Sequence, residues 1–423
     1  MKSVTRRDFV KSSMAAGVAL ALPFSRARGA NGSLGVAVVG INGRGRRLSA
    51  GFHNIPGVRV VALCDVDGNV LAGEVKKFKD RNENVNAYAD YRRMLEDKSI
   101  DVVAVATPDH WHVPLAAFSV IAGKDVYVEK PLSHTTSEGR LLVDLARKYG
   151  RIIQHGTQSR SAEGLTDAIE YLRSGELGKI RMAKAINSQL RRPIGRVPDS
   201  ETPAHVNYDL WLGPAPKRPF NRNRFHYNWH WFWDYGTGDI GNDGIHQIDI
   251  ARWGLGVELP KAVSCSGGQL FYNDDHQTPD TQIATFEYDD VYLMYEMRLW
   301  TPYKHEGHDN GNMFYGDNGK MSIGRDGWQV TFKDGSKGPG GDRGDESHIG
   351  NFIKAVRSRK VSDLNADVEA GHRSAVLCHL ANIAMRVGRR LRFDATQERF
   401  VGNAEANEYL TKKYRKGYEL PSL

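Results

Sequence analysis

The feature that most restricts the fold of this chain is a short apolar run that leads directly into a glycine-rich turn. Residues 35–39 read Gly-Val-Ala-Val-Val, and residues 40–45 read Gly-Ile-Asn-Gly-Arg-Gly. Small and β-branched residues without polar alternation are typical of a parallel strand that is buried on both faces. The turn resembles the G-x-G-x-x-G pattern of strand–turn–helix units that bind dinucleotides, with Asn42 at the position of the middle glycine. The sequence therefore predicts an α/β fold that begins with such a unit.

The residues of this turn have physical reasons to bind a pyrophosphate. Gly40 would allow the tight turn, and Gly45 would let the following helix pack closely on the strand. Asn42 is tolerated because asparagine adopts positive φ more readily than most other residues with a side chain. Free amides at the helix start would hold the phosphates. We predict that the cofactor-binding turn consists of Gly40, Asn42, Gly43, Arg44 and Gly45.

A second apolar run, residues 58–64, ends at Asp65, which lies 20 residues after Gly45. A carboxylate at this position accepts hydrogen bonds from the hydroxyls of the adenosine ribose. It would repel the 2′-phosphate of NADP, so Asp65 favours NAD as the cofactor. Asp67 is an alternative for the same role.

Two further apolar runs, residues 102–106 and 125–128, complete the pattern of a parallel sheet, because helical stretches at residues 92–97 and 113–122 separate the strands. Ligands of such sheets bind outside the carboxyl ends of the strands, and both runs end in polar clusters. We predict a Rossmann domain over residues 34–155. The strand ends add the following residues to the predicted cofactor site: Thr107, Pro108, His112, Glu129 and Lys130.

Several motifs of the chain resemble one family of oxidoreductases. Glu129-Lys130-Pro131 follows the fourth strand, and residues 242–249 read Asn-Asp-Gly-Ile-His-Gln-Ile-Asp. Further matches are residues 158–160, 175–180 and 316–320. On these motifs the chain resembles the glucose–fructose oxidoreductase, inositol dehydrogenase and rhizopine catabolism family (Gfo/Idh/MocA), from about Leu34 nearly to its C-terminus.

The resemblance implies the architecture of the rest of the chain. Residues 156–423 would form a substrate-binding α/β domain with a large open, mostly antiparallel sheet, and its C-terminal helices would pack back on the protein. The family implies an enzyme that uses a nicotinamide to oxidise or reduce a sugar or cyclitol. Lys130 would be the lysine of the substrate and nicotinamide site, and His246 and Asp249 would face the substrate from the second domain.

One position departs from the family motif. Asn242 stands where the family usually has aspartate, four residues before His246. Asn242 can hydrogen-bond a substrate hydroxyl, but it cannot orient a protonated histidine by charge or accept a proton. Asp243 or Asp239 could supply the missing carboxylate.

After Gly156 the residue pattern changes to mixed helices and alternating strands. The predicted strands are residues 180–188, 262–267, 281–288 and 291–299, the last two joined in a hairpin through Asp289 and Asp290. Residues 348–389 predict two helices, whereas residues 333–346, rich in glycine and aspartate, predict a flexible loop. The tail from Phe400 is rich in charge and tyrosine and could wrap a neighbouring chain, so the sequence is compatible with a homo-oligomer.

An aromatic segment at residues 226–236 reads His-Tyr-Asn-Trp-His-Trp-Phe-Trp-Asp-Tyr-Gly. Aromatic faces suit the apolar C–H surface of a sugar, and the polar side chains between them could bond its hydroxyls. We therefore predict that Trp231 and Trp233 bind substrate. The alternative is that Trp229, Trp231 and Trp233 alternate along a strand and fill the core.

The predicted reaction is hydride transfer between a hydroxyl-bearing carbon and nicotinamide C4. A helix that starts near Gly244 would place His246, Asp249 and Trp253 on one face toward the cofactor. Lys130, desolvated beside the ring, could polarise the substrate oxygen or carry its proton, and His246 is the alternative base. The histidines and carboxylates do not follow metal-ligand spacing, so we expect no metal.

The N-terminus predicts export. Residues 5–9 read Thr-Arg-Arg-Asp-Phe and precede an apolar run at residues 14–24, as in a twin-arginine signal that would occupy residues 1–29, with cleavage after Ala27 or Gly29. The run has 11 residues, whereas a permanent membrane helix needs about 20, so we expect a periplasmic protein without a membrane span. The net charge is +8, but this leader holds six basic residues and one acidic residue. The remaining charge of +3 gives little support to nucleic-acid binding.

Export and redox chemistry are compatible if the nicotinamide stays tightly bound and is regenerated in each cycle, because the periplasm has no recycled nicotinamide pool. Two enzyme classes meet this condition. One is a sugar oxidoreductase that couples an oxidation to a reduction. The other is a glycosidase or lyase that oxidises a ring carbon transiently, eliminates the aglycone and restores the hydride, as some family relatives do. A third hypothesis is a non-catalytic carbohydrate-binding protein with a vestigial cofactor fold.

Overall fold

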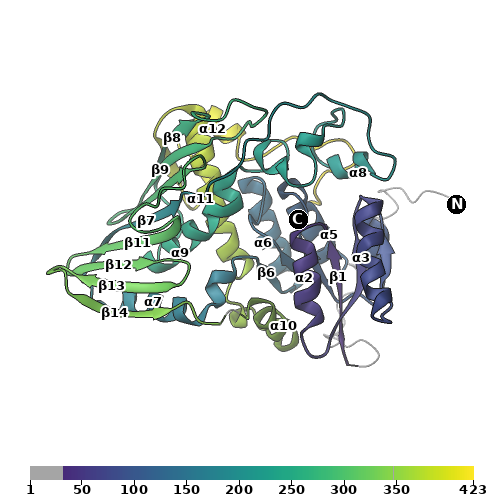
Figure 1. Cartoon of the computed structure of the whole chain (residues 1–423), viewed down its shortest axis with the longest axis horizontal. Coiled ribbons are helices and arrows are strands. Elements are labelled where there is room, and N and C mark those ends of the chain that lie inside the picture. Colours follow the sequence, from purple (N-terminus) through teal and green to yellow (C-terminus); the bar gives the residue numbers. More distant parts are fainter. Residues whose placement is uncertain (1–31, 346) are drawn as a thin grey trace.

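Two sheets organise the chain, and each forms the centre of one domain (Figure 1). The computed structural model describes residues 32–345 and 347–423. The twin-arginine leader predicted over residues 1–29 lies outside the described residues. Within the described part, no helix combines the length and the apolar character that a bilayer crossing requires.

The first sheet has six strands, all parallel, in the order β3-β2-β1-β4-β5-β6. The strands are β1 (Leu34–Val39), β2 (Val58–Cys64), β3 (Asn86–Tyr88), β4 (Val102–Val105), β5 (Asp125–Val128) and β6 (Ile153–His155). Central strands β1, β4 and β5 are buried along their whole length, as their uninterrupted apolar sequences require. The predicted Rossmann sheet is therefore confirmed.

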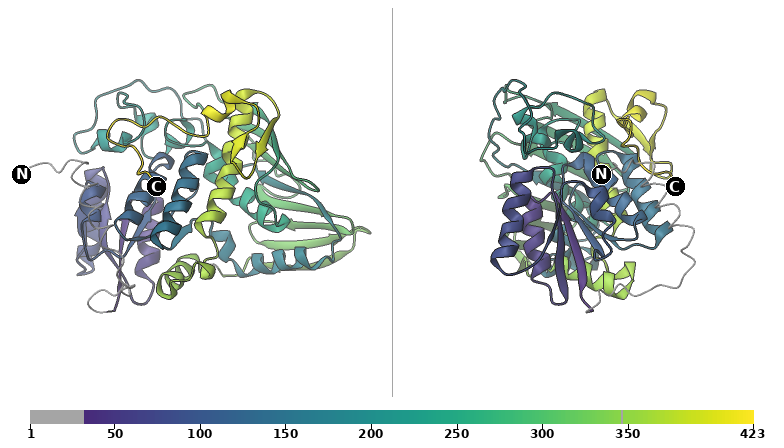
Figure 2. Two further views of the ribbon diagram at one scale, coloured as in Figure 1. Left: turned by 180° about the vertical axis from the view of Figure 1, so that it is seen from behind. Right: turned by 90° about the vertical axis from the view of Figure 1, so that its right-hand side faces the viewer.

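Helices cover both faces of this sheet (Figure 2). The helices of the first domain are α2 (Arg44–His53), α3 (Gly68–Asp80), α4 (Tyr91–Leu95), α5 (Asp109–Ile121) and α6 (Thr136–Tyr149). Helices α2 and α3 share one core with α10 (His348–Ser358), which comes from far along the chain. The rings of Phe52 in α2 and Phe352 in α10 meet edge to face at 6.3 Å. The last third of the chain thus completes the first domain.

The second sheet has ten strands in the order β14-β13-β12-β11-β7-β10-β9-β8-β15-β16. Only β7 and β10 pair in parallel among these described strands, so the predicted large, mostly antiparallel sheet is confirmed. The strands are β7 (Ile180–Asn187), β8 (Ala262–Gly268), β9 (Thr281–Glu287), β10 (Tyr292–Arg298), β11 (Asn310–Gly316), β12 (Gly319–Ile323), β13 (Gly327–Phe332), β14 (Lys337–Asp342), β15 (Leu391–Asp394) and β16 (Arg399–Phe400).

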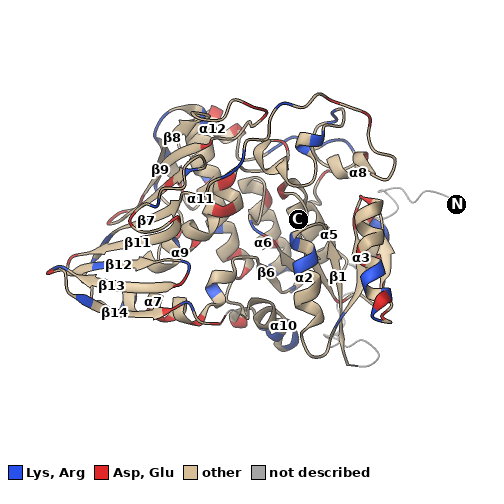
Figure 3. Ribbon diagram, in the orientation of Figure 1, with Lys and Arg blue, Asp and Glu red and all other residues tan. Residues whose placement is uncertain are grey.

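Helices α7, α9 and α11 pack on this sheet. The helices of the second domain are α7 (Glu163–Ser174), α8 (Tyr208–Leu212), α9 (Ile245–Leu255), α11 (Val368–Val387) and α12 (Ala404–Glu408). Helix α11 also packs on α6 of the first domain, which makes it the main helical link between the two sheets. Lysine and arginine are interspersed with aspartate and glutamate over both domains (Figure 3).

The prediction of a loop at residues 333–346 is wrong over its central part. Residues Lys337–Asp342 form β14 and pair with β13. Glycine weakens the sequence signal for a strand, but here it has a packing reason. A Cβ at Gly340 would lie 2.7 Å from the Trp328 carbonyl oxygen, and one at Gly341 would lie 3.0 Å from the Trp328 indole nitrogen. The glycines therefore let β14 lie directly against Trp328.

The C-terminal tail packs on its own chain. The Tyr414 hydroxyl donates to Glu138 in α6 at 2.7 Å, and the Arg415 guanidinium donates to the Gly213 carbonyl oxygen at 2.7 Å. Tyr418 lies edge to face against Trp111 of α5, with ring centres 5.8 Å apart. The tail thus crosses from the second domain back to the first.

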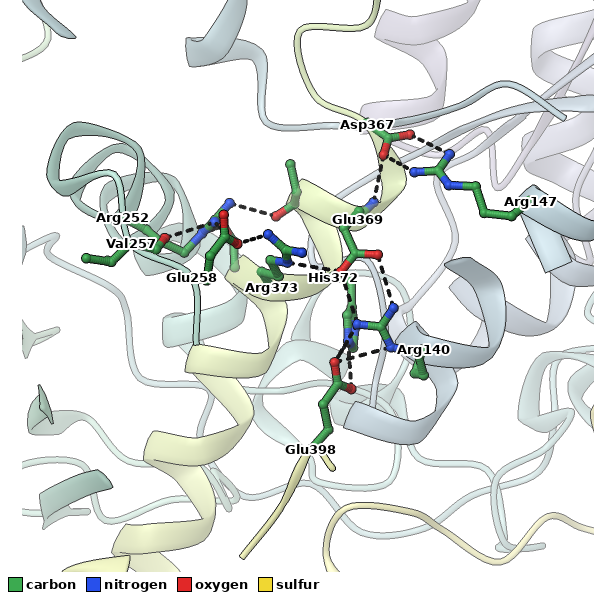
Figure 4. Close-up of polar contacts among 12 residues, drawn as sticks. Arg140, Arg147, Arg252, Val257, Glu258, Asp367, Glu369, His372, Arg373 and Glu398 are labelled. Carbon is green, nitrogen blue, oxygen red and sulfur yellow. Dashed lines mark hydrogen bonds and ion pairs between the residues drawn. The ribbon is translucent and has the colours of Figure 1, made fainter. Parts of the chain in front are cut away.

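A network of ion pairs also joins the two domains (Figure 4). Arg140 of α6 donates to Glu369 of α11 at 3.0 Å and contacts Glu398, which precedes β16. The same Glu398 carboxylate lies 2.9 Å from the buried ring of His372. One arginine of the first domain therefore holds two separate segments of the second.

Candidate functional site

A cavity of about 510 Å³ opens at the carboxyl ends of the first sheet. Its walls come from both domains. The glycine-rich turn, Asp65 and Lys130 line it from the first domain, and Asn242 and His246 line it from the second. Residues more than 100 positions apart thus meet in one space.

The glycine-rich turn forms the floor of this cavity. Gly40 has φ +76°, and a Cβ there would lie 2.7 Å from the Ala106 carbonyl oxygen. A Cβ at Gly45 would lie 2.0 Å from the Gly40 carbonyl oxygen, so this glycine is needed for the close approach of α2 to β1. Gly43 has φ +69° and open space around it. Positive φ falls on Gly40 and Gly43 and not on Asn42, whose amide lies 3.0 Å from the ring of His226.

Asp65 lines the cavity, whereas Asp67 does not. The Asp65 carboxylate accepts the backbone amides of Ile41 at 2.9 Å and Asp67 at 3.0 Å, and burial raises its pKa. Asp67 caps α3 by accepting the amides of its first turn. Of the two candidates for the ribose, Asp65 is therefore the one with access to a ligand.

Glu129 and Arg44 form an ion pair across the cavity. The Arg44 Nε donates to Glu129 Oε1 at 2.7 Å, and the Gln158 amide donates to the same oxygen at 3.2 Å. Glu129 is buried, whereas Arg44 is partly exposed. The pair fastens the start of α2 to the end of β5, so the turn and Lys130 keep a fixed relation.

His112 joins the ends of β4 and β5. Its Nδ1 lies 2.6 Å from the Pro131 carbonyl oxygen, and its Nε2 lies 2.9 Å from the Thr107 carbonyl oxygen. Burial lowers the pKa of His112. The Thr107 hydroxyl is buried and has no hydrogen-bond partner among the described residues, and Pro108 directly precedes α5. All three residues line the cavity.

Lys130 crosses from the first domain to Asn242 of the second. Its ammonium donates to the Asn242 backbone carbonyl and, at 3.1 Å, to the Asn242 side-chain oxygen. The Asn242 amide in turn donates to Asp239 at 2.9 Å, and Asp239 forms an ion pair with Arg191 at 2.8 Å. Asp243 accepts a hydrogen bond from Asn310 instead. Asp239 is thus the carboxylate attached to Asn242, one hydrogen bond further from Lys130 than an aspartate at position 242 would be.

His246 lies at the start of α9, just after a π-helical turn over Ile240–Gly244. Its Nδ1 is buried and has no partner among the described residues. Burial, followed by the charge of Lys130, lowers the pKa of His246 to about 3. The ring is therefore neutral near pH 7, where it offers one donor and one acceptor and is a weak proton acceptor.

The structure differs from the prediction at Asp249. This carboxylate does not line the cavity. It accepts hydrogen bonds from the Arg160 guanidinium at 2.7 and 3.0 Å and from the Ser374 hydroxyl at 2.6 Å. Arg160 also lies 5.2 Å from the ring centre of Trp253. Asp249 and Trp253 do share a helix face, but that face holds Arg160 and not a ligand.

The aromatic segment also differs from the prediction. Residues Asn228–Trp231 form a 3-10 turn and not a strand. Trp231 is 2% exposed and packs on His276, and Trp233 lies against Arg386. Neither lines the cavity, so the substrate contacts predicted for them are corrected. With about three residues per turn, alternation does not hold, and Trp229 is the tryptophan of this segment that lines the cavity.

Sequence reasoning missed two neighbours of Trp229. Tyr227 and His230 line the cavity, and the His230 ring stacks on Trp229 at 3.6 Å. Their place in the aromatic segment marked both as candidates, but the 3-10 turn decides which side chains of the segment reach the cavity. No three His, Cys, Asp or Glu side chains of the described residues are grouped so that they could hold a metal ion.

Comparison with known proteins identifies the family. Residues 34–157 match the model described as the oxidoreductase family, NAD-binding Rossmann fold, and residues 194–420 match that of its C-terminal alpha/beta domain. The chain belongs to the Gfo/Idh/MocA oxidoreductase family. The first matched region contains the six strands of the first sheet, and the second contains β8 to β16, whereas β7 lies between the two regions.

Curated relatives of this Gfo/Idh/MocA protein align over part of their length. Glycosyl hydrolase family 109 protein 2 of Shewanella sp. (strain ANA-3) is 32% identical over 171 residues, which cover 34% of this chain and 38% of that protein. Inositol 2-dehydrogenase of Salmonella paratyphi B is 28% identical over 177 residues, 41% of this chain and 49% of that protein. The alignments thus span less than half of these relatives.

Solved structures share the Gfo/Idh/MocA fold over most of the chain. The WlbA dehydrogenase from Bordetella pertussis, in complex with NADH and UDP-GlcNAcA, has a TM-score of 0.66 at 17% identity and covers 86% of this chain and 99% of that chain. A levoglucosan dehydrogenase in complex with NADH has a TM-score of 0.65 at 18% identity, over 85% of this chain and 98% of that chain. At such identities the likeness concerns the fold.

Proposed function

We propose that this protein is an NAD-dependent oxidoreductase that acts on a hydroxyl group of a sugar, glycoside or cyclitol. The observation that carries the proposal is the composition of the cavity. The glycine-rich turn and Asp65 lie in the same space as an amine, Lys130, and an imidazole, His246, from the other domain. Membership of the Gfo/Idh/MocA family supports the same reaction class.

The residues present fit a dinucleotide. Gly43, which has open space around it, leaves room for phosphates beside the start of α2, where no side chain caps the helix. Asp65 suits the ribose hydroxyls and disfavours a 2′-phosphate. The unpartnered Thr107 hydroxyl and His246 Nδ1 are further groups that a ligand would satisfy. When bound, the nicotinamide accepts a hydride from a carbon that bears a hydroxyl group, or returns one.

The side chains around the substrate position divide the remaining work. As an ammonium, Lys130 donates a hydrogen bond that would polarise the substrate oxygen; as the neutral amine, it would take up the proton that the hydroxyl loses when the hydride leaves. Asn242 fixes the amine through two oxygens. His246, neutral because burial lowers its pKa to about 3, would orient a hydroxyl and is a weak base. The ring of Trp229, which lines the cavity, would face the C–H surface of the sugar.

A second candidate is a glycosidase or lyase that uses NAD without net redox. The 32% identity to a glycosyl hydrolase family 109 protein favours it. Oxidation of a ring carbon acidifies the adjacent C–H; loss of that proton expels the aglycone, water adds to the double bond, and the hydride returns. Free aglycone released from a glycoside, with the nucleotide in the same redox state before and after, would support this candidate over net oxidation.

The first test is chemical. The purified leader-free protein is denatured, and released nucleotide is identified by mass. Stoichiometric NAD would support both the Asp65 assignment and a tightly held cofactor. Finding no nucleotide, and no binding of added NAD or NADP, would end the proposal. A protein that retains NAD and binds sugar but shows neither net redox nor aglycone release would instead be a binding protein.

We also propose that the protein is exported to the periplasm by the twin-arginine route. This proposal rests on residues 5–9 and the apolar run that follows them. Changing Arg6 and Arg7 together to lysine should leave the full-length protein in the cytoplasm. Equal periplasmic fractions for the changed and unchanged proteins would contradict it.

A further inference from the structure

The segment that carries the second-domain site residues is tied to the first domain at successive positions. The His110 amide donates to the Tyr235 carbonyl oxygen at 3.1 Å. The His134 ring lies 3.3 Å from the Gly236 carbonyl oxygen. Next along the chain, the Thr237 hydroxyl donates to the Asp109 carboxylate at 2.8 Å. The contact of Lys130 with Asn242 closes the series, which brings His246 to the cavity.

Asp109 is the carboxylate in this series. It is the first residue of α5, just after Pro108, and it is 1% exposed. Its Oδ2 accepts from Thr237, whereas its Oδ1 is buried without a partner among the described residues. Asp109 does not line the cavity, so it does not touch a ligand there.

The Asp109–Thr237 bond lies directly behind the contact between Lys130 and Asn242. A Cβ at Gly241 would lie 1.9 Å from the Thr237 hydroxyl oxygen and 3.4 Å from Cγ of Pro131. Gly241 precedes Asn242, and Pro131 follows Lys130. Thr237 is therefore packed against the turn that presents Asn242. Pro131, the residue after Lys130, lies beside the same turn.

We propose that Asp109 is a positioning residue for the reaction: through Thr237 it holds the turn of Asn242 against Lys130, and in its ionised form it balances the charge of the Lys130 ammonium. The proposal rests on the proposed function for its kinetic consequence. Asp109 acts through Thr237 and through its field, without contact with substrate or cofactor.

The electrostatics of the surroundings support this role. Burial raises the pKa of Asp109 to about 7, while the hydrogen bond from Thr237 and the charges of Lys130 and Lys412 act in the opposite direction. Burial, with a smaller contribution from the Asp109 charge, raises the pKa of the Cys378 thiol. The adjacent His110 is neutral, because burial lowers its pKa to about 3. Lys130 and Lys412 are thus the cations that stabilise this buried charge.

Two substitutions separate the charge of Asp109 from its hydrogen bond. Asp109→Asn keeps an oxygen that can accept from Thr237 but removes the charge. The lysine amines are labelled with acetic anhydride over a range of pH, and the Lys130 peptide is quantified by mass spectrometry. We expect the midpoint of Lys130 labelling to move to lower pH than in the unchanged protein, because an opposite charge nearby stabilises the ammonium. An unchanged midpoint would overturn the electrostatic part.

Thr237→Val removes the hydrogen bond and keeps the charge, while Thr237→Ser keeps both. For Thr237→Val we expect the same Lys130 labelling midpoint as in the unchanged protein. Its kcat should be at least about tenfold lower and its KM within about twofold, because the substitution disturbs the geometry of the reacting groups and not substrate binding. Serine should restore kcat. If Thr237→Val and Thr237→Ser had the same kcat, whether unchanged or reduced, the positioning role of Asp109 would be overturned.

Asp125→Asn is the matched control. Asp125 is equally buried and is bound by Arg359, but it begins β5, at the opposite end of the strand from Lys130. The Asp125→Asn protein should be less stable than the unchanged protein, but its Lys130 labelling midpoint should be the same. Labelling needs no turnover, so an inactive unchanged protein would contradict the proposed function while leaving the charge of Asp109 testable. If Asp109→Asn does not fold, the Thr237 pair decides the outcome.

Discussion

At the scale of single residues, the contact of Lys130 with Asn242 is the point where the two domains meet chemically. The amine reaches the cavity from the end of β5, and both oxygens of Asn242 hold it there. An aspartate in place of Asn242 would add a charge beside Lys130. The neutral amide adds no charge there, and the Asp239 carboxylate is linked to Lys130 only through Asn242.

Lys130→Met should reduce turnover by at least about 10²-fold, since the group that polarises the substrate oxygen is lost. Nucleotide retention, measured by mass after denaturation, should stay unchanged, because the turn and Asp65 are intact. Lys124→Met is the control: Lys124 precedes the same strand and donates to the Ile100 carbonyl oxygen, away from the cavity. Lys124→Met should lower the stability of the protein and leave turnover unchanged. Comparable turnover in the two variants would contradict the assignment.

Most residues of the candidate site could be predicted because they lie at strand ends or in a motif. The turn from Gly40, Asp65 and Lys130 depend only on local sequence and on the parallel sheet. Asp249 could not be predicted in the same way, because its partner Arg160 lies 89 positions away. The direction of Trp231 depended on a 3-10 turn that the spacing of tryptophans does not reveal.

At the scale of elements, the junction of β1 and α2 depends on close backbone contact. Gly45→Ala should destabilise the protein by about 1–3 kcal/mol and weaken nucleotide retention, because the added methyl group overlaps the Gly40 carbonyl oxygen. Gly73→Ala is the control, as Gly73 is exposed in α3 with open space around it. That variant should be neutral or more stable by about 0.4–1 kcal/mol. Equal unfolding midpoints in urea for the two variants would contradict this account of the turn.

Strands and helices with strong side-chain patterns were predictable, and those stabilised by backbone contacts were not. The apolar runs of β1, β2, β4 and β5 predicted the first sheet, and the apolar stripes of α10 and α11 predicted two helices. Strand β14 has the sequence Lys-Gly-Pro-Gly-Gly-Asp, which carries almost no side-chain signal. It forms because β13 offers it hydrogen bonds and Trp328 requires glycine opposite.

At the scale of the whole molecule, buried histidines should make the fold sensitive to acid. Burial lowers the pKa of His110, His155, His246 and His379 to about 3, against about 6.5 in the unfolded chain. The unfolded state therefore binds more protons below pH 6.5, and stability is lost as the pH falls toward 3. Each histidine costs up to about 1.4 kcal/mol per pH unit in this window.

Urea unfolding midpoints at pH 7.5, 6.0 and 5.0 measure this effect. We expect a steady fall of the midpoint below pH 6.5. Asp109 acts in the opposite direction, since its pKa of about 7 lets the folded state take up a proton there. His379→Gln, far from the cavity, should make the fall shallower. A midpoint that stays constant from pH 7.5 to 5.0 would contradict the burial of these rings as neutral groups.

The return of the tail to the first domain makes one wall of the cavity depend on a segment that is synthesised late. Tyr418 packs on Trp111, and Trp111 lines the cavity. Tyr418 follows β16 along the chain. This part of the wall therefore gains its support only after the strands of both sheets have been synthesised.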